Sequence, residues 1–557
     1  MGRQKSNGFI MQAGILAAAG IIVRFIGILY RSPLVAIIGD EGNGYYNTAY
    51  NIYTIILLIS SYSIPSAISK VIAARLAKKE YKNAQRIFIC SFIYVVITGG
   101  IGSLLCFFGA EFLVGQSSAA VLRVFAPTIF LSGLLGVLRG YFQAHRTMLQ
   151  TSFSQILEQI LNAVVSLLAA WLLMGMVSDK DVTTQAIYGA AGSALGTGSG
   201  VLIALLFMWM IYLLNRSSIQ RRIKHDRTRT VLGYGEIFKI IIFMVTPVVL
   251  STFIYNLNTA SNLKFYQGIM QTFKGYTEAE ATTSYGLYSG KAIQIINIPV
   301  AIASSMSAAI IPTIARTYEV KAKKETKQQI AKAIKVTMLI SIPSAVGLFV
   351  LAKPIVMLLY PQKATVEMVA ALIRTMSIAV VFYGLSTLTN AVLQGTGKVN
   401  KPVFHALFSL VIQTLVLVPL LLYTSLDLYA LSVATVLYSF LMCVFNSISI
   451  RKHLKYKQEI LRTFVLPFIA AFWMGAFAAG IYYGMDQLMK LLEGKAGAAF
   501  SDMLVNVICL LPSLIIAVIV YFMLVIKLGA LNRKELKSMP KGHLLLKIAV
   551  KFRLIHS

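Results

Sequence analysis

The sequence predicts an all-α integral membrane protein, and three observations lead to that fold class. Of the 557 residues, 57% are hydrophobic and only 13% are charged. The mean hydropathy is +0.74, which is typical of polytopic helical membrane proteins and not of soluble domains. Apolar runs recur along the whole chain, each long enough for a hydrocarbon layer that needs about 20 helical residues. Together these features predict fourteen transmembrane helices.

The predicted spans follow the apolar runs in chain order. We expect helices at residues 9–30, 45–68, 87–110, 119–143, 151–176, 186–214, 236–262, 284–312, 330–352, 365–394, 402–424, 428–450, 463–489 and 500–527. Because the number of spans is even, both termini are expected on the same side of the membrane.

Basic residues are concentrated in alternate loops. The chain has 51 Lys and Arg against 20 Asp and Glu, a net charge of +31. The loops 111–118 and 425–427 contain no Lys or Arg, whereas 70–86 and 216–229 are rich in both. Since basic loops stay in the cytoplasm, both termini are expected there. This topology accounts for the charge without a nucleic-acid partner, and attraction to anionic membrane lipids is secondary.

An internal repeat divides the predicted helices. Arg123 and Arg374 lie 251 residues apart, as do Gln143 and Gln394. Helices one to six therefore resemble helices seven to twelve in the same direction, a transporter architecture with the substrate site between the halves. We expect two six-helix lobes in parallel repeat plus two extra C-terminal helices. The predicted divisions are an N-terminal lobe at 1–215, a basic cytoplasmic linker at 216–235, a C-terminal lobe at 236–451, a final helix pair at 452–528 and a basic cytoplasmic tail at 529–557.

The first span carries two arginines on a face of small residues. Arg24 and Arg31 share that face with Gly20 and Gly27. Placing an Arg deep in lipid costs free energy, roughly from a few to more than ten kcal/mol. Two interpretations follow: Arg24 pairs with a carboxylate on a neighbouring helix, or both arginines face a water-filled cavity that receives an anion.

Polar stripes run along other spans as well. Hydrogen bonding between helices is the ordinary explanation for any one stripe. The stripes on the first, second, seventh and eighth helices nevertheless occupy matching places in the two repeats. We therefore predict a substrate-binding set consisting of Arg24, Arg31, Asn47, Asn51, Tyr255, Asn258, Asn262, Tyr288 and Lys291.

Acidic residues inside the spans are scarce. Glu158 is the one acid well inside an apolar run, against six cations at Arg24, Arg31, Arg123, Arg139, Lys291 and Arg374. Glu158 is expected to be a structural partner for Arg139 or Arg123, and the alternative is a cation- or proton-coupling site. One carboxylate cannot neutralise six cations, so a phosphate or pyrophosphate would suit the remaining charge.

The sequence lacks the motifs of an enzyme. It contains no phosphate-binding glycine loop with Lys-Ser/Thr, and its six histidines show no metal-ligand spacing. We therefore expect neither catalytic residues, nor a metal, nor a cofactor. Coupling to Na⁺ or H⁺, or to the membrane potential, stays open.

Four motifs together resemble a known family. They are Arg24-Phe-Ile-Gly-x-x-x-Arg31, the Gly-Asp-Glu-Gly-Asn-Gly-Tyr-Tyr-Asn turn that starts at Gly39, Tyr288-Ser-Gly-Lys291, and Gln394-Gly-x-Gly-Lys398. In this order within fourteen helices, the chain resembles the multidrug/oligosaccharidyl-lipid/polysaccharide exporter (MOP) superfamily. Within it the chain is similar to the polysaccharide-transporter branch that holds the MurJ-like lipid II flippases of Gram-positive bacteria.

The resemblance implies a two-lobed bundle around a cationic cavity, in the bacterial cytoplasmic membrane. Arg24 and Arg31 match the family's cavity arginines, Lys291 matches an Arg position, and the last two helices match a groove for the lipid tail. The implied function is a flippase that moves an undecaprenyl-pyrophosphate-linked glycan, above all the peptidoglycan precursor lipid II, to the outer leaflet by alternating access. The implied partners are this lipid-linked substrate and the cell-wall synthesis machinery, and a monomer is expected.

Other functions stay open beside this one. A flippase for another lipid-linked polysaccharide precursor belongs to the same class. A cation-coupled multidrug exporter would want more buried acids than Glu158. A membrane-bound transferase is a third class. The sequence leaves the glycan, the coupling ion and the oligomeric state undecided.

Overall fold

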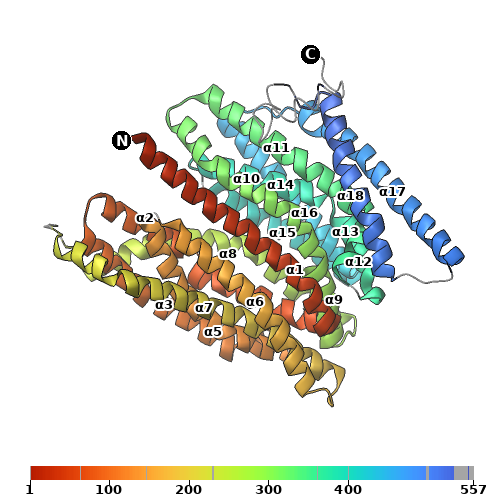
Figure 1. Ribbon diagram of the computed structural model, residues 1–557, viewed down its shortest axis with the longest axis horizontal. Coiled ribbons are helices and arrows are strands. Elements are labelled where there is room, and N and C mark those ends of the chain that lie inside the picture. The colour runs from red at the N-terminus through yellow and green to blue at the C-terminus, as the bar shows by residue number, and fades with distance from the viewer. Residues whose placement is uncertain are drawn as a thin grey trace. The chain divides into compact units, whose positions relative to one another are not determined.

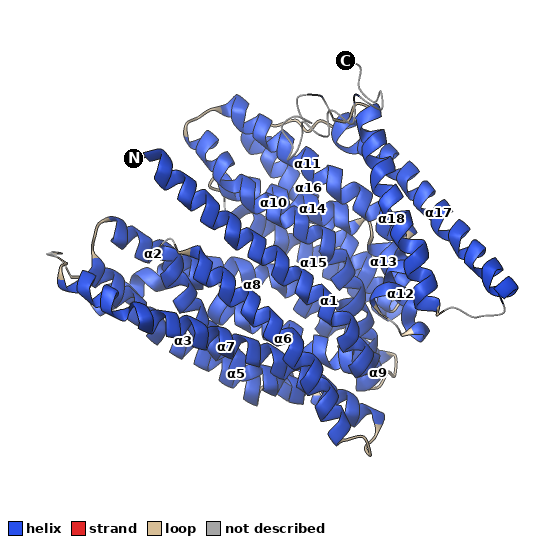
Figure 2. Ribbon diagram, viewed as in Figure 1, coloured by secondary structure: helices blue, strands red, loops and turns tan. Residues whose placement is uncertain are grey.

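The computed structural model describes residues 2–531 apart from 63, 146, 227, 229–230, 361, 399 and 497–500, together with 533 and 550. Within these residues, side chains are described except at 2–18, 21, 28, 61–64, 66–67, 244, 247–252, 254–255, 305–313 and 493–496. The described chain is helical throughout, with turns between helices and no strand (Figure 2).

The chain divides into two compact units, residues 1–286 and 287–557 (Figure 1). The first unit contains α1 (Gly2–Leu57), the π-helical turn η1 (Leu58–Tyr62), α2 (Ile64–Ala77), α3 (Tyr81–Phe108), α4 (Ala110–Val114), α5 (Gln116–Ala144), α6 (Met148–Met176), α7 (Val182–Lys224), α8 (Tyr234–Phe273) and α9 (Glu278–Gly286). The second contains η2 (Leu287–Ala292), α10 (Ile293–Glu319), α11 (Lys323–Val350), α12 (Ala352–Leu359), η3 (Lys363–Thr365), α13 (Val366–Met376), α14 (Ala379–Gly395), α15 (Asn400–Tyr423), α16 (Leu428–Leu454), η4 (Leu461–Val465), α17 (Leu466–Ala496) and α18 (Asp502–Lys527).

The long helix α1 reverses direction at Gly39. This residue has φ 70° and ψ −177°, a conformation that glycine adopts without a Cβ clash. On a straight helix, Arg31 and Tyr50 would lie about 28 Å apart, at ~1.5 Å per residue. The guanidinium carbon of Arg31 instead lies 6.0 Å from the centre of the Tyr50 ring. The helix is therefore two arms, residues 2–38 and 40–57, which correspond to the first two predicted spans.

The fourteen predicted spans all fall on helices to within a few residues in the described part of the chain. Ten helices there are long and apolar enough to cross a membrane, or eleven if the bent pair Lys363–Met376 and Ala379–Gly395 is one span. The count is lower than fourteen partly because both arms of α1 enter as one span, Ile22–Ser60. The all-α membrane fold is confirmed.

Small residues bring α6 and α7 into close contact. Gly192, Gly196 and Gly200 repeat every fourth residue on α7 and face α6. A Cβ added at Gly192 would lie 2.5 Å from the carbonyl oxygen of Ala169, and one at Gly200 would lie 2.5 Å from that of Glu158. Without side chains at these positions the two backbones can approach, which favours helix association in membranes.

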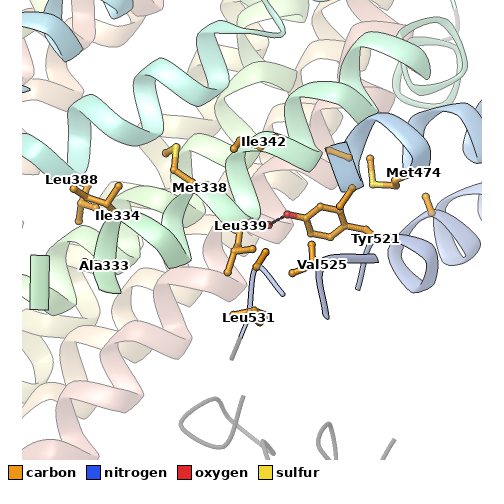
Figure 3. Packing of buried hydrophobic residues seen from close by; sticks show 14 of the residues in the cluster. Ala333, Ile334, Met338, Leu339, Ile342, Leu388, Met474, Tyr521, Val525 and Leu531 are labelled. Carbon is orange, nitrogen blue, oxygen red and sulfur yellow. Dashed lines mark hydrogen bonds between the residues drawn. The ribbon is translucent and has the colours of Figure 1, made fainter. Parts of the chain in front are cut away.

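The second unit has a hydrophobic core that joins α11 to the last two helices (Figure 3). Met338 and Leu339 of α11 pack with Met474 of α17 and Val525 of α18. The Tyr521 hydroxyl at the edge of this core donates a hydrogen bond to the carbonyl oxygen of Leu339 at 2.9 Å (Figure 3). The phenol thus satisfies its polar atom while the ring stays buried.

The 251-residue repeat is visible as a polar link in each unit. In the first unit Arg139 Nε of α5 donates to Ser154 Oγ of α6 at 2.9 Å. The positions 251 residues later are Asn390 on α14 and His405 on α15. There Asn446 of α16 bridges the two, donating to Asn390 Oδ1 at 2.8 Å and accepting from His405 Nδ1 at 2.7 Å.

The predicted lobe boundaries stay a prediction. Helix α8 (234–273) was assigned to the C-terminal lobe on the repeat, whereas its contacts group it with α1, α3 and α9 in the first compact unit. The predicted lobes group helices by their place in the sequence repeat, whereas the compact units group helices that touch one another. The two divisions therefore need not coincide.

We expect Gly192→Ala to lower the melting temperature of the purified protein. The added Cβ would lie 2.5 Å from a backbone oxygen of α6, and overpacking of this kind costs about 1–3 kcal/mol. Thermal unfolding in detergent measures the effect.

Gly100→Ala is the matched control for this prediction. No atom lies within 4 Å of a Cβ added at Gly100 in α3. Alanine is also the better helix former, so the melting temperature should hold or rise. Equal melting temperatures for the two variants would contradict the close contact of α6 and α7.

Candidate functional site

The predicted binding residues divide between the two compact units. Tyr288 and Lys291 belong to η2 in the second unit. The first unit holds the other seven: Arg24, Arg31, Asn47 and Asn51 on α1, and Tyr255, Asn258 and Asn262 on α8. Each group is described within its own unit.

The two arginines of the first arm have different surroundings. Arg24 is exposed, and Arg31 is half-buried. Arg31 lies over the face of Tyr50 on the second arm, a cation–π contact of about 0.5–2 kcal/mol. The turn at Gly39 creates this contact because it folds the two arms together. The first arm thus presents one guanidinium held on an aromatic ring and another on the helix surface.

An aromatic cluster surrounds the Arg31 contact. Tyr46, Tyr50 and Tyr53 follow one face of the second arm, and Phe125 of α5 packs among them at centroid distances of 4.7–5.9 Å. The prediction from sequence missed this cluster, although the four- and three-residue spacing of the tyrosines was a signal for it. Because Tyr46, Tyr53 and Phe125 are buried, this cluster is a packed support behind the Arg31–Tyr50 contact.

The small-residue face of the first arm is partly packed and partly open. A Cβ at Gly27 would lie 3.4 Å from Gln159 Nε2 of α6, so this glycine admits a neighbouring side chain. No atom lies within 4 Å of a Cβ at Gly20 among the described residues. The face is therefore closely packed at Gly27 and has no described neighbour within 4 Å at Gly20.

The two asparagines of the second arm are not equivalent. Asn47 is 2% exposed and donates to Asn43 O and Asn43 Oδ1, both at 2.7 Å. Asn51 Nδ2 and Thr54 Oγ1, one and two turns further on, are buried and have no hydrogen-bond partner in the described part of the chain. Buried polar atoms are normally satisfied, so Asn51 is the better candidate for contact with a ligand or water.

The predicted residues of α8 are also buried where the structure describes them. Asn258 is 8% exposed and Asn262 is 3% exposed. Asn258 Oδ1 has no hydrogen-bond donor within the described residues. The side chain of Tyr255 lies outside the described residues, so its role stays a prediction.

Glu158 forms an ion pair with Arg139. The Arg139 guanidinium donates to Glu158 Oε2 at 2.6 Å, with side-chain exposures of 14% for Arg139 and 29% for Glu158. This is the structural pairing that the sequence favoured for Glu158. Arg123 instead pairs with Glu111 at 2.7 Å on an exposed surface.

Lys291 is buried inside the second unit. It is 1% exposed, and its ammonium donates to Thr365 Oγ1 at 3.1 Å and Gln362 Oε1 at 3.3 Å. The same ammonium lies 5.4 Å from the centre of the Tyr360 ring. Tyr288 is held by a hydrogen bond with Thr435 of α16. Direct binding of a headgroup by Lys291 would require these contacts to open, and its role stays a prediction.

Guanidinium groups and buried amides inside long apolar helices are costly in lipid and mark a transport pathway. Fold and site together define a polytopic membrane transporter. Residues 86–495 match the family model described as Lipid II flippase MurJ. The chain belongs to the lipid II flippase family, which lies within the MOP superfamily expected from the sequence.

Two curated relatives cover most of the chain. Stage V sporulation protein B of Bacillus subtilis is 24% identical over 506 residues, 88% of this chain and 93% of the relative. Lipid II flippase MurJ of the same organism is 23% identical over 508 residues, 87% of this chain and 90% of the relative. Both matches extend over nearly the full length of the relatives.

Solved structures of transporters share the fold. An inward-facing multidrug resistance MATE family transporter of the MOP superfamily gives a TM-score of 0.65 at 16% identity, covering 80% of this chain and 98% of that one. Lipid II flippase MurJ in an inward closed conformation gives 0.62 at 15% identity, covering 91% of this chain and 97% of that one. At these identities the likeness concerns the fold alone.

We expect Arg139→Gln to destabilise the protein because Glu158 would keep its charge without a partner. Breaking a fully buried pair costs roughly 3–5 kcal/mol, and partial exposure reduces the expected loss to about 1–3 kcal/mol. The double variant Arg139→Gln/Glu158→Gln should recover part of that loss. Thermal unfolding measures all three proteins.

Arg123→Gln is the control for the ion pair. Its pair with Glu111 is exposed, so its removal should cost less than about 1 kcal/mol. An Arg139→Gln variant as stable as Arg123→Gln would show that the Arg139–Glu158 pair contributes little to the fold.

Proposed function

We propose that this protein is a flippase for an undecaprenyl-pyrophosphate-linked glycan, with lipid II as the foremost substrate. It would carry the headgroup from the inner to the outer leaflet by alternating access. Family membership supports transport of a lipid-linked precursor. The relative named Lipid II flippase MurJ supports the choice of glycan.

The observation that carries the proposal is the placement of Arg24 and Arg31 on one arm of α1. A guanidinium suits a pyrophosphate because it can donate two parallel hydrogen bonds to phosphate oxygens. Arg31 is already positioned by the Tyr50 ring, which lowers the entropy cost of binding. Asn51 Nδ2 and Asn258 Oδ1 supply a buried donor and a buried acceptor for sugar hydroxyls and amides.

The proposal extends to topology and partners. The concentration of Lys and Arg in alternate loops supports cytoplasmic termini in a bacterial plasma membrane. The protein would act as a monomer and hand its cargo to the cell-wall synthesis machinery. The predicted lobes, 1–215 and 236–451, would alternate access, and the helix pair at 452–528 would guide the lipid tail.

The membrane potential is the proposed energy source, without a cofactor. A cationic substrate site feels about 2.3 kcal/mol per charge for each 100 mV. The alternative source is a Na⁺ or H⁺ gradient acting through Glu158, which the Arg139 pair disfavours.

We expect Arg24→Ala and Arg31→Ala each to abolish flipping in proteoliposomes that contain lipid II. Removal of either guanidinium deletes a phosphate ligand and leaves the apolar helix intact. The measurement is the accessibility of labelled lipid II to an external enzyme over time.

Arg216→Ala is the matched control, because Arg216 is an exposed member of the basic stretch 216–229. It should flip lipid II at the wild-type rate. Full activity of Arg24→Ala and Arg31→Ala would remove both residues from the site. Wild-type transport of another lipid-linked glycan, with lipid II left in place, would favour the alternative substrate. Export of cationic drugs alone would favour the multidrug exporter.

A second experiment tests the energy source. Flipping by the wild-type protein should change its rate when a potential is imposed across the vesicle membrane. Equal flipping rates with and without the potential would exclude the membrane potential as the energy source. A rate that depends on a Na⁺ or pH gradient would instead point to coupling through Glu158.

A further inference from the structure

A cavity of about 200 Å³ lies within the first unit, at the helix ends that meet the basic loops. Its walls come from the end of α2, the start of α3, the end of α5, the start of α6 and the last turns of α7. The basic stretches 70–86 and 216–229 contribute to its rim. It contains none of the predicted binding residues. It is therefore a separate site, independent of the proposed flippase function.

A cation and a neutral imidazole face this cavity. Arg222 of α7 supplies the guanidinium. His145 follows α5 directly and supplies the imidazole. Its Nδ1 lies 2.9 Å from the carbonyl oxygen of Tyr141. That nitrogen must carry the proton, because a carbonyl only accepts. Burial lowers the pKa of His145, and Arg222 lowers it further, so the ring is neutral near pH 7 and Nε2 is an acceptor.

Two amide oxygens add further acceptors. The residues Gln85 and Gln150 line this cavity. Their Oε1 atoms are buried and accept no hydrogen bond from the described part of the chain. Gln85 Nε2 donates to the Tyr212 hydroxyl at 3.1 Å, and Gln85 Oε1 is the atom left without a donor. Buried acceptors of this kind are satisfied by water or by a ligand that brings O–H or N–H groups.

The aromatic wall completes the chemistry. Tyr141 is 4% exposed and packs against the His145 ring at a centroid distance of 4.4 Å. Its ring offers an apolar surface to carbon–hydrogen bonds of a ligand. The cavity volume of about 200 Å³ leaves room for a small polar ligand.

We propose that this cavity binds a phosphate group that carries a small polyol, as in glycerophosphate. The phosphate lies on Arg222, and the two hydroxyls of the glycerol donate to two of the three acceptors Gln85 Oε1, Gln150 Oε1 and His145 Nε2. Two sources have this chemistry: the headgroup of phosphatidylglycerol in the adjacent leaflet, and a free glycerol phosphate in the cytoplasm.

The test uses the full-length protein in phosphatidylcholine nanodiscs, with the melting temperature and native mass spectrometry as readouts. One arm adds phosphatidylglycerol to the nanodisc, and the other titrates soluble glycerol 3-phosphate. Nanodiscs with phosphatidylethanol, which keeps the phosphate charge and lacks the hydroxyls, separate specific binding from attraction by charge.

Wild-type protein should be stabilised by at least one glycerophosphate source and less by phosphatidylethanol. Arg222→Gln should weaken the binding about tenfold or more, and Gln150→Leu should reduce the preference for phosphatidylglycerol over phosphatidylethanol. Arg221→Gln is the matched control, since Arg221 directly precedes Arg222 on α7, is exposed like it, and does not line the cavity. It should behave as wild type.

Stabilisation by phosphatidylglycerol alone identifies the lipid headgroup as the source, and stabilisation by the soluble compound identifies the free phosphate. Equal responses to phosphatidylglycerol and phosphatidylethanol, or equal loss in Arg222→Gln and Arg221→Gln, would overturn the proposal. Gln150→Leu decides the matter if Arg222→Gln does not fold. Because the assay measures no flipping, its failure leaves the proposed flippase function unaffected.

Discussion

Charged and amide side chains inside a hydrocarbon layer need protein partners, and this constraint organises the described structure. Arg139 reaches Glu158 and Ser154 between α5 and α6. Arg31 reaches the Tyr50 face, and Lys291 reaches Gln362, Thr365 and Tyr360. Each contact joins two helical segments that the apolar surface alone would not orient, since lipid tails are as apolar as leucine. The polar contacts therefore set which faces meet, and the glycines of α7 set how closely they meet.

Much of the fold was predictable because length and hydropathy are properties of each segment by itself. In the described part of the chain every predicted span lies on helix to within a few residues, and positions related by the 251-residue offset, Arg139 and Asn390, take part in polar links in the structure. The break within 365–394 was not predicted: α13 and α14 bend by 48° there. Nor was it predicted that only the turn at Gly39 would separate the first two helices. Bends of this kind depend on torsion angles of single residues and leave hydropathy unchanged.

The candidate site was predictable in part. An Arg in an apolar run is visible without a structure, and so is the scarcity of acids that could pair with it. Which partner each cation takes is a matter of tertiary packing: Glu158 could have met Arg123, which pairs with Glu111. The four-residue spacing puts Asn47 and Asn51 on the same helix face. The Asn47 amide donates a hydrogen bond to Asn43, whereas Asn51 Nδ2 has no partner within the described residues. Sequence periodicity identifies a face and cannot rank the residues on it.

The reversal of α1 is confined to one residue, Gly39. A loop of several residues would spread a change of angle over many torsions and dissipate it. Here two torsions of one glycine carry the whole bend, with rigid helix on either side. Any change in the angle between the two arms must therefore pass through the torsions of that one residue.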